Sequence, residues 1–286
     1  MLTEHGVKIA PSTYYDHKNR QPSKRELRDR ELITIIEQER EEKFVRLLGA
    51  RKMWLRLRSM GHEVARCTVE RLFGQLGISG ITRARGPRTT IADETTPRPA
   101  DLVDRAFVAS RPNQLWCADF TYVPTWEGMV YVAFIFDVFS RRVLGWRAAT
   151  SMTTPLVLDA LEMAIWIRRK DGVTDLSGLV HHTDAGSQYT SIAFTQRLIE
   201  AGVDASVGTV GDAYDNALAE SQIGIYKSEL IWPHGPWRDV DHVEAETLDW
   251  VHWFNTERPH ESIDDFTPVQ AEQFHYTHQA RLSQTG

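Results

Sequence analysis

The chain has little cysteine and no long apolar segment. Only Cys67 and Cys117 occur among its 286 residues, which argues against a disulfide framework and for a reducing compartment. Two cysteines are also too few for a Cys-based zinc site, and no histidine spacing completes one. No apolar run approaches the roughly 20 residues of a membrane span, and the N-terminus lacks an apolar signal-peptide segment. We therefore expect a cytoplasmic protein.

Acidic residues outnumber basic residues in the chain as a whole, but the basic residues are concentrated towards the N-terminus. The net charge is −6, which at first argues against a nucleic-acid partner. Residues 1–90, however, hold 19 Lys and Arg against 11 Asp and Glu, whereas the remainder holds 14 against 28. A basic front half joined to an acidic back half is typical of nucleic-acid proteins. The acidic half would need metal ions or local basic patches to approach a polyanion.

The front half carries helical patterns. Residues 24–43 are dense in charge with a modest apolar stripe, which predicts a solvated or packing helix. Two further short helices are predicted, each followed by a glycine in a C-cap role, Gly61 and Gly77. They fit a helix-turn-helix, although a plain helical hairpin is the alternative. The surplus of arginine favours DNA, with Arg66 and Arg71 directed at a groove or backbone.

A linker follows this region. Residues 80–100 are rich in Gly, Pro, Thr and charge but lack apolar periodicity. Arg83 and Arg85 within it are candidates to follow a phosphate backbone.

The back half has the pattern of an α/β domain. Aromatic and β-branched residues fill three segments, 114–124, 128–140 and 141–150, which predicts an antiparallel meander. Helical and strand patterns then alternate, with helices at 153–170, 191–202 and around 242–255 and strands at 178–184 and 203–208, while residues 211–227 begin like a turn and continue like a helix. This order predicts a ribonuclease-H-like core, a mixed five-stranded sheet flanked by helices, preceded by the α-helical helix-turn-helix region.

The expected domain organisation follows from these patterns. It comprises an N-terminal helical arm (1–44), a helix-turn-helix region (45–80), a linker (81–110), a catalytic core (111–275) and a C-terminal tail (276–286).

Three acidic residues are candidates for metal binding. Asp119 interrupts the apolar pattern of the first strand, where Asp is disfavoured. Asp184 ends the fourth strand, at the edge where parallel sheets carry their sites, and Glu220 lies on a later helix. Carboxylates bind hard divalent cations, and two such ions ~4 Å apart serve in-line phosphoryl displacement. Each residue also has an ordinary alternative, as a paired strand Asp, a turn Asp or a solvated helix Glu.

The predicted helix around Glu220 carries further polar residues on one line. Asn216, Glu220 and Lys227 nearly eclipse, because they are four and seven positions apart. A solvated helix can do this by chance, but a helix that brings a carboxylate to a metal and an ammonium to a phosphate requires it. Two competing acids have simpler explanations, since Asp137 precedes a turn and Asp212 suits an N-cap.

These segments resemble the insertion-sequence family 3 transposases, the product of their second reading frame, over almost the whole chain. APSTYY resembles their N-terminal tyrosine pair, GARKMWLRLRSMGHEVARCTVERLFGQLGISG their helix-turn-helix, and FNTERPHESIDDFTP their C-terminal N-x-x-R-P-H segment. PNQLWCADFTYV, HHTDAGSQYTS and YDNALAESQIGIYKSEL carry Asp119, Asp184 and Glu220. Thirty-five residues between the last two acids, with Lys seven positions on, is a spacing shared with retroviral integrases.

The resemblance implies a DDE-type polynucleotidyl transferase. Asp119, Asp184 and Glu220 would bind two Mg²⁺ ions, or Mn²⁺ in their place, to nick the inverted-repeat ends of an insertion sequence and transfer them by the 3′-hydroxyl. Lys227 would reach a phosphate, and Asn216 a sugar, phosphate or base. The implied partners are end and target DNA, further copies of the chain on that DNA near the bacterial nucleoid, and an upstream-frame product fused by frameshifting.

Three other functions are weighed against this one. A tyrosine or serine recombinase needs an Arg-rich catalytic set that the acidic half lacks. A ribonuclease H shares the sheet but neither the helical front half nor the Lys at +7. The runner-up is a DNA-binding regulator or assembly factor with an inactive integrase-like core, and the intact set of three acids argues against it. The end sequence, the target preference and the number of copies are not encoded in any visible motif.

Overall fold

The structure is a computed structural model. It describes residues 10–82, 108–183, 189, 191–207 and 217–284. The chain divides into two compact units, residues 1–80 and 81–286, and each is described by itself. Within the described residues, no helix is long and apolar enough to cross a membrane.

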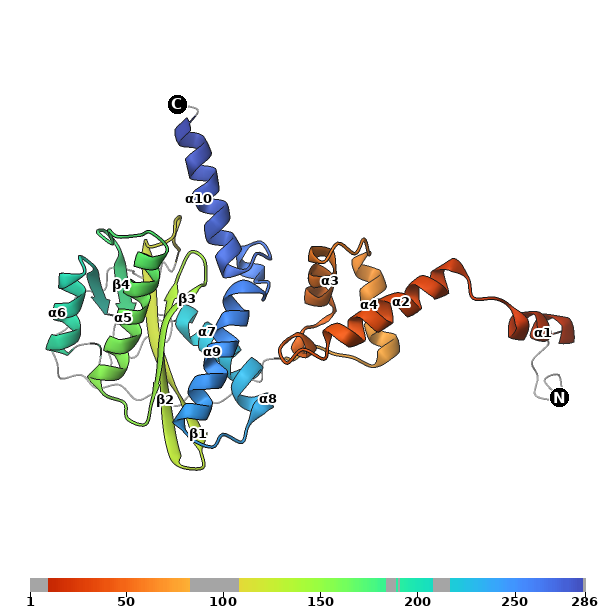
Figure 1. The fold of residues 1–286 in the computed structure, drawn as a ribbon, viewed down its shortest axis with the longest axis horizontal. Helices are drawn as coiled ribbons and strands as arrows, with labels where there is room; N and C mark the ends of the chain where they lie inside the picture. Colours follow the sequence, from red (N-terminus) through yellow and green to blue (C-terminus); the bar gives the residue numbers. More distant parts are fainter. Residues whose placement is uncertain (1–9, 83–107, 184–188, 190, 208–216, 285–286) are drawn as a thin grey trace. The chain divides into compact units, whose positions relative to one another are not determined.

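The N-terminal unit is helical throughout its described part (Figure 1). Its elements are α1 (Pro11–Asn19), α2 (Lys24–Glu39), the 3₁₀ turn η2 (Val45–Leu47), α3 (Ala50–Ser59) and α4 (Arg66–Leu76). Helix α2 begins in a capping box, in which Ser23 and Glu26 each accept a backbone N–H of the other. Gly61 and Gly77 follow α3 and α4 with φ of 89° and 65°, which glycine adopts without strain. Both helix ends therefore agree with the prediction.

The turn between α3 and α4 is fixed by side-chain contacts. The indole nitrogen of Trp54 on α3 donates to the carbonyl of Val64 at 2.8 Å. One side of α4 is apolar and buried, with Val69, Leu72 and Phe73 all buried. Two short helices joined by a turn that a side-chain hydrogen bond fixes have the geometry of a helix-turn-helix.

The C-terminal unit is built on one mixed sheet. In the described residues it has five strands, β1 (Leu115–Thr125), β2 (Gly128–Asp137), β3 (Val143–Ala149), β4 (Val180–Thr183) and β5 (Asp204–Val207). Their order is β3-β2-β1-β4-β5. The first three strands are antiparallel neighbours, and β4 and β5 run parallel to β1. The predicted meander and mixed sheet are confirmed, and β1 is the central strand.

Helices cover both faces of this sheet (Figure 1). Helices α5 (Thr154–Lys170) and α6 (Ile192–Glu200) share one core with Trp116 and Ala118 of β1. Helices α7 (Ala217–Tyr226) and α9 (Val240–Thr256) lie on the other face, where Tyr226 and Trp250 contact the ring of Phe134 on β2. Between and after them come the π-helical segment η3 (Lys227–Ile231), α8 (Trp232–His234), η4 (Glu261–Ile263) and α10 (Pro268–Gln284).

The packing of α5 on the sheet depends on one glycine. A Cβ at Gly145 of β3 would lie 1.9 Å from the carbonyl oxygen of Ala160, so only glycine lets this helix approach so closely. At the C-terminus, α10 runs without interruption across residue 275, where the sequence suggested that the core gives way to a tail.

Candidate active site

Asp119 lies in the middle of the central strand. It pairs with Phe134 across the antiparallel β1–β2 ladder, and directly opposed residues share a face of the sheet. Phe134 contacts Tyr226 at the end of α7, with ring centroids 4.9 Å apart. The half-buried Asp119 carboxylate therefore lies on the face that α7 covers. Its Oδ1 accepts the backbone N–H of Phe120 at 2.8 Å.

The neighbouring strand ends beside this position. In the parallel β1–β4 ladder Thr183 pairs with Ala118. Thr183 is the last residue of β4, and the chain continues from it into Asp184. Asp184 itself lies outside the described residues, as do Asn216, Arg83 and Arg85.

Glu220 and Lys227 lie on the segment that packs on β1. Glu220 is exposed in the first turn of α7, and α7 contacts β1. The regular α-helix ends at Tyr226, and Lys227 opens the π-helical segment η3. The chain is therefore regular α-helix from Glu220 to Tyr226, and the extra residue that a π-helix accommodates in its turn falls after Lys227.

The Lys227 ammonium sits in a mixed aromatic and acidic environment. Its nitrogen lies 4.6 Å from the centre of the Tyr122 ring, a cation–π distance. Burial lowers the pKa of Lys227, and the negative charge of Asp119 opposes that shift. Tyr122 was not among the predicted site residues. Its signal in the sequence is weak, since an aromatic residue in a strand is ordinary.

The carboxylates have the chemistry of a metal site, but the described part of the chain does not complete one. Among the residues that the structure describes, no group of three or more His, Cys, Asp or Glu could hold a metal ion. Asp184 is not in that described part. The structure thus positions Asp119 and Glu220 on a strand and a helix that pack together, and leaves the joint metal site of all three acids as a prediction.

Asp137, the competing acid on β2, belongs to a buried ionic cluster. It is fully buried, and its carboxylate accepts from Arg168 at 3.1 Å. Arg168 also donates to Glu272 on α10 at 2.7 and 2.8 Å, and Arg142 donates to the same carboxylate at 2.6 Å. Burial alone would raise the pKa of Glu272, but the two guanidinium groups outweigh burial and lower it. The cluster joins β2, α5 and α10, so Asp137 has a structural explanation.

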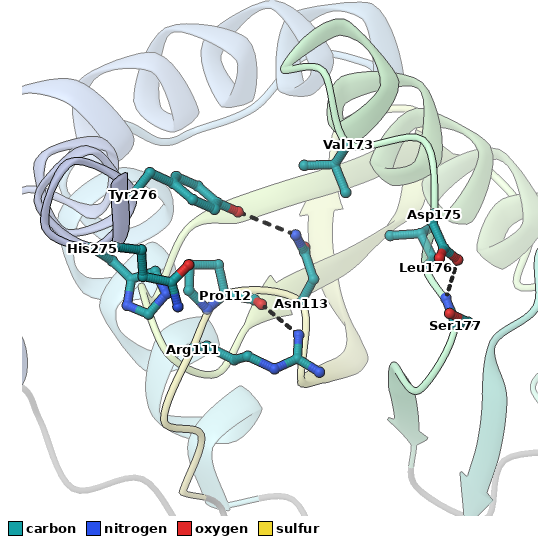
Figure 2. Close-up of a pocket in the computed structure, with 10 residues that line it drawn as sticks. Arg111, Pro112, Asn113, Val173, Asp175, Leu176, Ser177, His275 and Tyr276 are labelled. Carbon is teal, nitrogen blue, oxygen red and sulfur yellow. Dashed lines mark hydrogen bonds between the residues drawn. The ribbon is translucent and has the colours of Figure 1, made fainter. Parts of the chain in front are cut away.

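A cavity of about 200 Å³ lies next to this cluster, near the start of β1 (Figure 2). Its polar groups bond with one another, since Asn113 donates to the Tyr276 hydroxyl and Asp175 accepts from Ser177. Arg111 contacts the carbonyl of Pro112 at 3.5 Å. The cavity is lined mainly by loop and α10 residues and includes none of the predicted site residues.

The two arginines predicted to contact DNA differ in their surroundings. Arg66 is exposed at the start of α4 and forms an ion pair with Glu70, one turn on, at 2.7 Å. Arg71 is half-buried and forms an ion pair with Asp29 of α2, also at 2.7 Å. Arg71 therefore joins α4 to α2, whereas the Arg66 side chain lies at the surface of the unit.

Arg258, in the C-terminal N-T-E-R-P-H segment, was also not among the predicted site residues. Its guanidinium is buried against Glu229 of η3, two residues after Lys227. Asn255 of the same segment accepts from and donates to the backbone of Val143 at 2.9 Å. The motif itself was visible in the sequence, but its partners are far away along the chain.

Comparison with known proteins places the chain in a family. The integrase core domain family matches residues 109–213, and a second integrase core domain family matches 201–268. An HTH-like domain family matches residues 24–86. A Mycobacterium tuberculosis protein named for the transposase of insertion sequence element IS986/IS6110 is 56% identical over 96% of this chain and 98% of its own. The chain belongs to the insertion-sequence family 3 transposases.

One further curated relative agrees with this membership. The transposase for insertion sequence element IS629 of Shigella sonnei is 48% identical, over 94% of this chain and 89% of its own. Among solved structures, the HTLV-2 integrase catalytic core domain in complex with magnesium is 19% identical with a TM-score of 0.43, over 57% of this chain and 98% of that one. By its matches to the integrase core and HTH-like families and to the transposase relatives, the transposase is an enzyme of the polynucleotidyl transferase type, with an integrase core and a helix-turn-helix-like region.

Proposed function

We propose that this transposase nicks the inverted-repeat ends of its insertion sequence and joins the freed 3′-hydroxyl to target DNA. The observation that supports this most is the register at the centre of the sheet. Thr183, which precedes Asp184, pairs with Ala118, which precedes Asp119. Adjacent strands lie about 4.8 Å apart, so the last described residue of β4 lies beside the position that precedes the first acid.

The donor set fits a pair of hard divalent cations. Carboxylate oxygens are the ligands that Mg²⁺ prefers, and Asp119 and Glu220 come from a strand and a helix in contact. Asp119, Asp184 and Glu220 would hold two Mg²⁺ ions, with Mn²⁺ able to replace them. When bound, these ions supply activation of the attacking oxygen and charge stabilisation for the leaving 3′ oxygen.

The basic side chains would position the DNA. Lys227, whose ammonium lies over the Tyr122 ring and is acted on by the charge of Asp119, would contact a phosphate oxygen near the reactive end, and Asn216 would bond to the same end. In the N-terminal unit the exposed Arg66 would contact DNA, and Arg83 and Arg85 would follow its phosphate backbone. Phosphate contacts of this kind fix the register of a protein on DNA and carry no sequence information themselves.

Both steps balance without a covalent protein–DNA intermediate. Hydrolysis adds water across the bond between phosphorus and the 3′ oxygen, which leaves a 3′-hydroxyl on the element end and a 5′-phosphate on the flank. In strand transfer that hydroxyl oxygen bonds to a target phosphorus, and the target strand leaves with its own 3′-hydroxyl. The protein's task is therefore to hold two DNA segments in line.

The wider assembly follows from this chemistry. Joining both ends of an element requires that two ends be brought together, so we propose at least two copies of the chain on DNA, acting in the bacterial cytoplasm at the nucleoid. An upstream-frame product, fused to this chain by frameshifting, is the further partner that we propose.

A cleavage assay on DNA that carries an inverted-repeat end tests the proposal. With Mg²⁺ present, the wild-type protein should nick the end, and Asp119→Asn, Asp184→Asn and Glu220→Gln should each abolish nicking while end binding is largely kept. Asp249→Asn, at an exposed position on α9, is the matched control and should cleave normally. Binding without metal-dependent cleavage by the wild-type protein would instead favour a regulator with an inactive core.

A further inference from the structure

Lys227 lies at an irregular point of the chain. It is the first residue of the π-helical segment η3, which continues directly from α7. Single π-helical turns are rare and occur frequently at functional sites. Because such a turn is less favourable than the regular helix around it, contacts from neighbouring elements must hold it in place.

The residue before Lys227 is fixed from α9. The Tyr226 hydroxyl is 2.7 Å from the Thr247 hydroxyl, and the Tyr226 ring contacts Trp250 with centroids 5.0 Å apart. Tyr226 is fully buried. Its backbone therefore has little freedom, and this fixes the chain where it enters the π-helical turn.

The residue two positions after Lys227 is fixed from the end of α9. Glu229 and Arg258 are both buried. The Arg258 guanidinium donates from Nε to both carboxylate oxygens of Glu229, at 3.0 and 2.9 Å, and from Nη2 at 2.8 Å. A guanidinium that meets a carboxylate in this two-point manner constrains orientation as well as distance.

Arg258 is itself held on its far side. Its backbone N–H donates to the carbonyl of Trp253 at 3.0 Å, and its Nη1 lies 3.1 Å from Nδ1 of His260. The His260 ring packs against Phe254, with centroids 4.4 Å apart. Arg258 thus links α9 and the segment after it to the π-helical turn, because it bonds to both.

We propose that Arg258 is a positioning residue for Lys227 and that it acts through Glu229. This rests on the proposed contact between Lys227 and DNA. A lysine side chain is long and flexible, and ordering it on DNA costs conformational entropy. With Tyr226 and Glu229 both anchored, the Lys227 ammonium is set over the Tyr122 ring before DNA arrives.

A purely structural role makes a different prediction. Buried ion pairs contribute little net stability, and apolar residues of similar volume often replace the whole pair without loss. A double variant, Glu229→Leu with Arg258→Met, removes both charges together and leaves neither unpaired. If the pair only fills the core, this variant should melt and bind DNA like the wild type.

The test measures end binding over a range of salt concentrations, together with end cleavage. In the wild type, Lys227→Ala should flatten the slope of log K against log salt by about 0.9, the value for one phosphate contact on duplex DNA. The double variant should show the same flattening and cleave about tenfold or more slowly. Adding Lys227→Ala to the double variant should then change the slope no further.

The test distinguishes a wrong DNA contact of Lys227 from a wrong positioning role of Arg258. If Lys227→Ala leaves the slope of the wild type unchanged, the proposed DNA contact is wrong and the positioning role falls with it. If Lys227→Ala flattens the wild-type slope and flattens that of the double variant equally, the DNA contact stands and the positioning role is wrong. Glu162→Leu with Arg197→Met removes another two-point pair, between α5 and α6, and should leave slope and cleavage unchanged.

A conservative variant covers the case in which the double variant does not fold. Arg258→Lys keeps the charge but replaces the planar fork by a single ammonium. It should retain the fold, as measured by circular dichroism and thermal melting, and still slow end cleavage and flatten the salt slope. Wild-type slope and cleavage in a folded Arg258→Lys protein would overturn the proposal.

Discussion

The ammonium nitrogen of Lys227 lies 4.6 Å from the centre of the Tyr122 ring. Both Tyr122 and Asp119 belong to β1, so one strand supplies the aromatic face and the negative charge that act on this cation. Burial lowers the pKa of Lys227 while Asp119 raises it. The lysine seven positions after Glu220 is thereby tied to the central strand of the sheet.

The aromatic face should matter more than the tyrosine hydroxyl. Tyr122→Phe keeps the ring and should bind end DNA like the wild type. Tyr122→Leu removes the cation–π contact, worth about 0.5–1 kcal/mol at an exposed site, and should weaken end binding by a few fold. Equilibrium binding to a labelled end measures both variants, and equal affinities for the two would show that the ring does not orient Lys227.

Loss of the Lys227 charge should weaken end binding without unfolding the protein. Lys227→Ala should lower affinity most at low salt, because one released counterion is lost from the binding equilibrium. Lys170→Ala is a matched control, since Lys170 lies 5.2 Å from the Trp166 ring on α5, a helix on the opposite face from α7. A similar loss of affinity in Lys170→Ala would indicate a general charge effect.

Substitutions of Arg66 and Arg71 should affect different properties, DNA affinity for Arg66 and stability for Arg71. The exposed Arg66–Glu70 pair contributes little to folding, so Arg66→Ala should lower DNA affinity and leave the melting temperature nearly unchanged. The half-buried Arg71–Asp29 pair joins α4 to α2, so Arg71→Ala should lower the free energy of unfolding of this unit by about 1 kcal/mol. Urea unfolding and salt-dependent binding distinguish the two, and the reverse pattern would contradict this assignment.

Local sequence signals predicted most of the fold, because its elements have strong local causes. Gly61 and Gly77 end α3 and α4 where a left-handed residue is needed, and the alternating aromatic and β-branched residues around Asp119 form the central strand. The order of strands and helices then allowed one arrangement of the sheet to be predicted. α10 was not predicted as one helix, since its pattern carries little apolar periodicity.

The parts that were not predicted depend on partners distant in the sequence. Arg258 bonds to Glu229, 29 residues away, and Arg168 to Glu272, 104 residues away. No local pattern distinguishes these acids from solvated ones. The change from α- to π-helix at Lys227 likewise depends on contacts made by its neighbours, and local helical spacing did not predict it.

His181 should make the protein sensitive to acid. Burial lowers its pKa to about 3, and His182 adds to the effect, whereas an unfolded histidine titrates near 6.5. Between these values the unfolded chain binds one more proton than the folded chain. The free energy of unfolding should therefore fall by up to ~1.4 kcal/mol per pH unit as the pH drops below about 6.

Replacing the ring nitrogens should reduce this acid sensitivity. His181→Phe retains a ring next to Phe194, whose ring centroid lies 5.5 Å from that of His181. Urea midpoints at pH 7 and pH 5 should differ less in this variant than in the wild type. His252→Phe, at an exposed position on α9, is the control. An unchanged pH dependence in His181→Phe would show that other groups cause the loss of stability at acidic pH.

The most direct test of the account is a crystal structure of the transposase bound to an inverted-repeat end in Mn²⁺, with anomalous scattering used to locate the ions. We predict two anomalous peaks about 4 Å apart, contacted by carboxylate oxygens of Asp119, Asp184 and Glu220. Peaks held by other residues, or a Glu220 carboxylate that reaches neither ion in the DNA complex, would contradict the shared metal site on which the proposed chemistry depends.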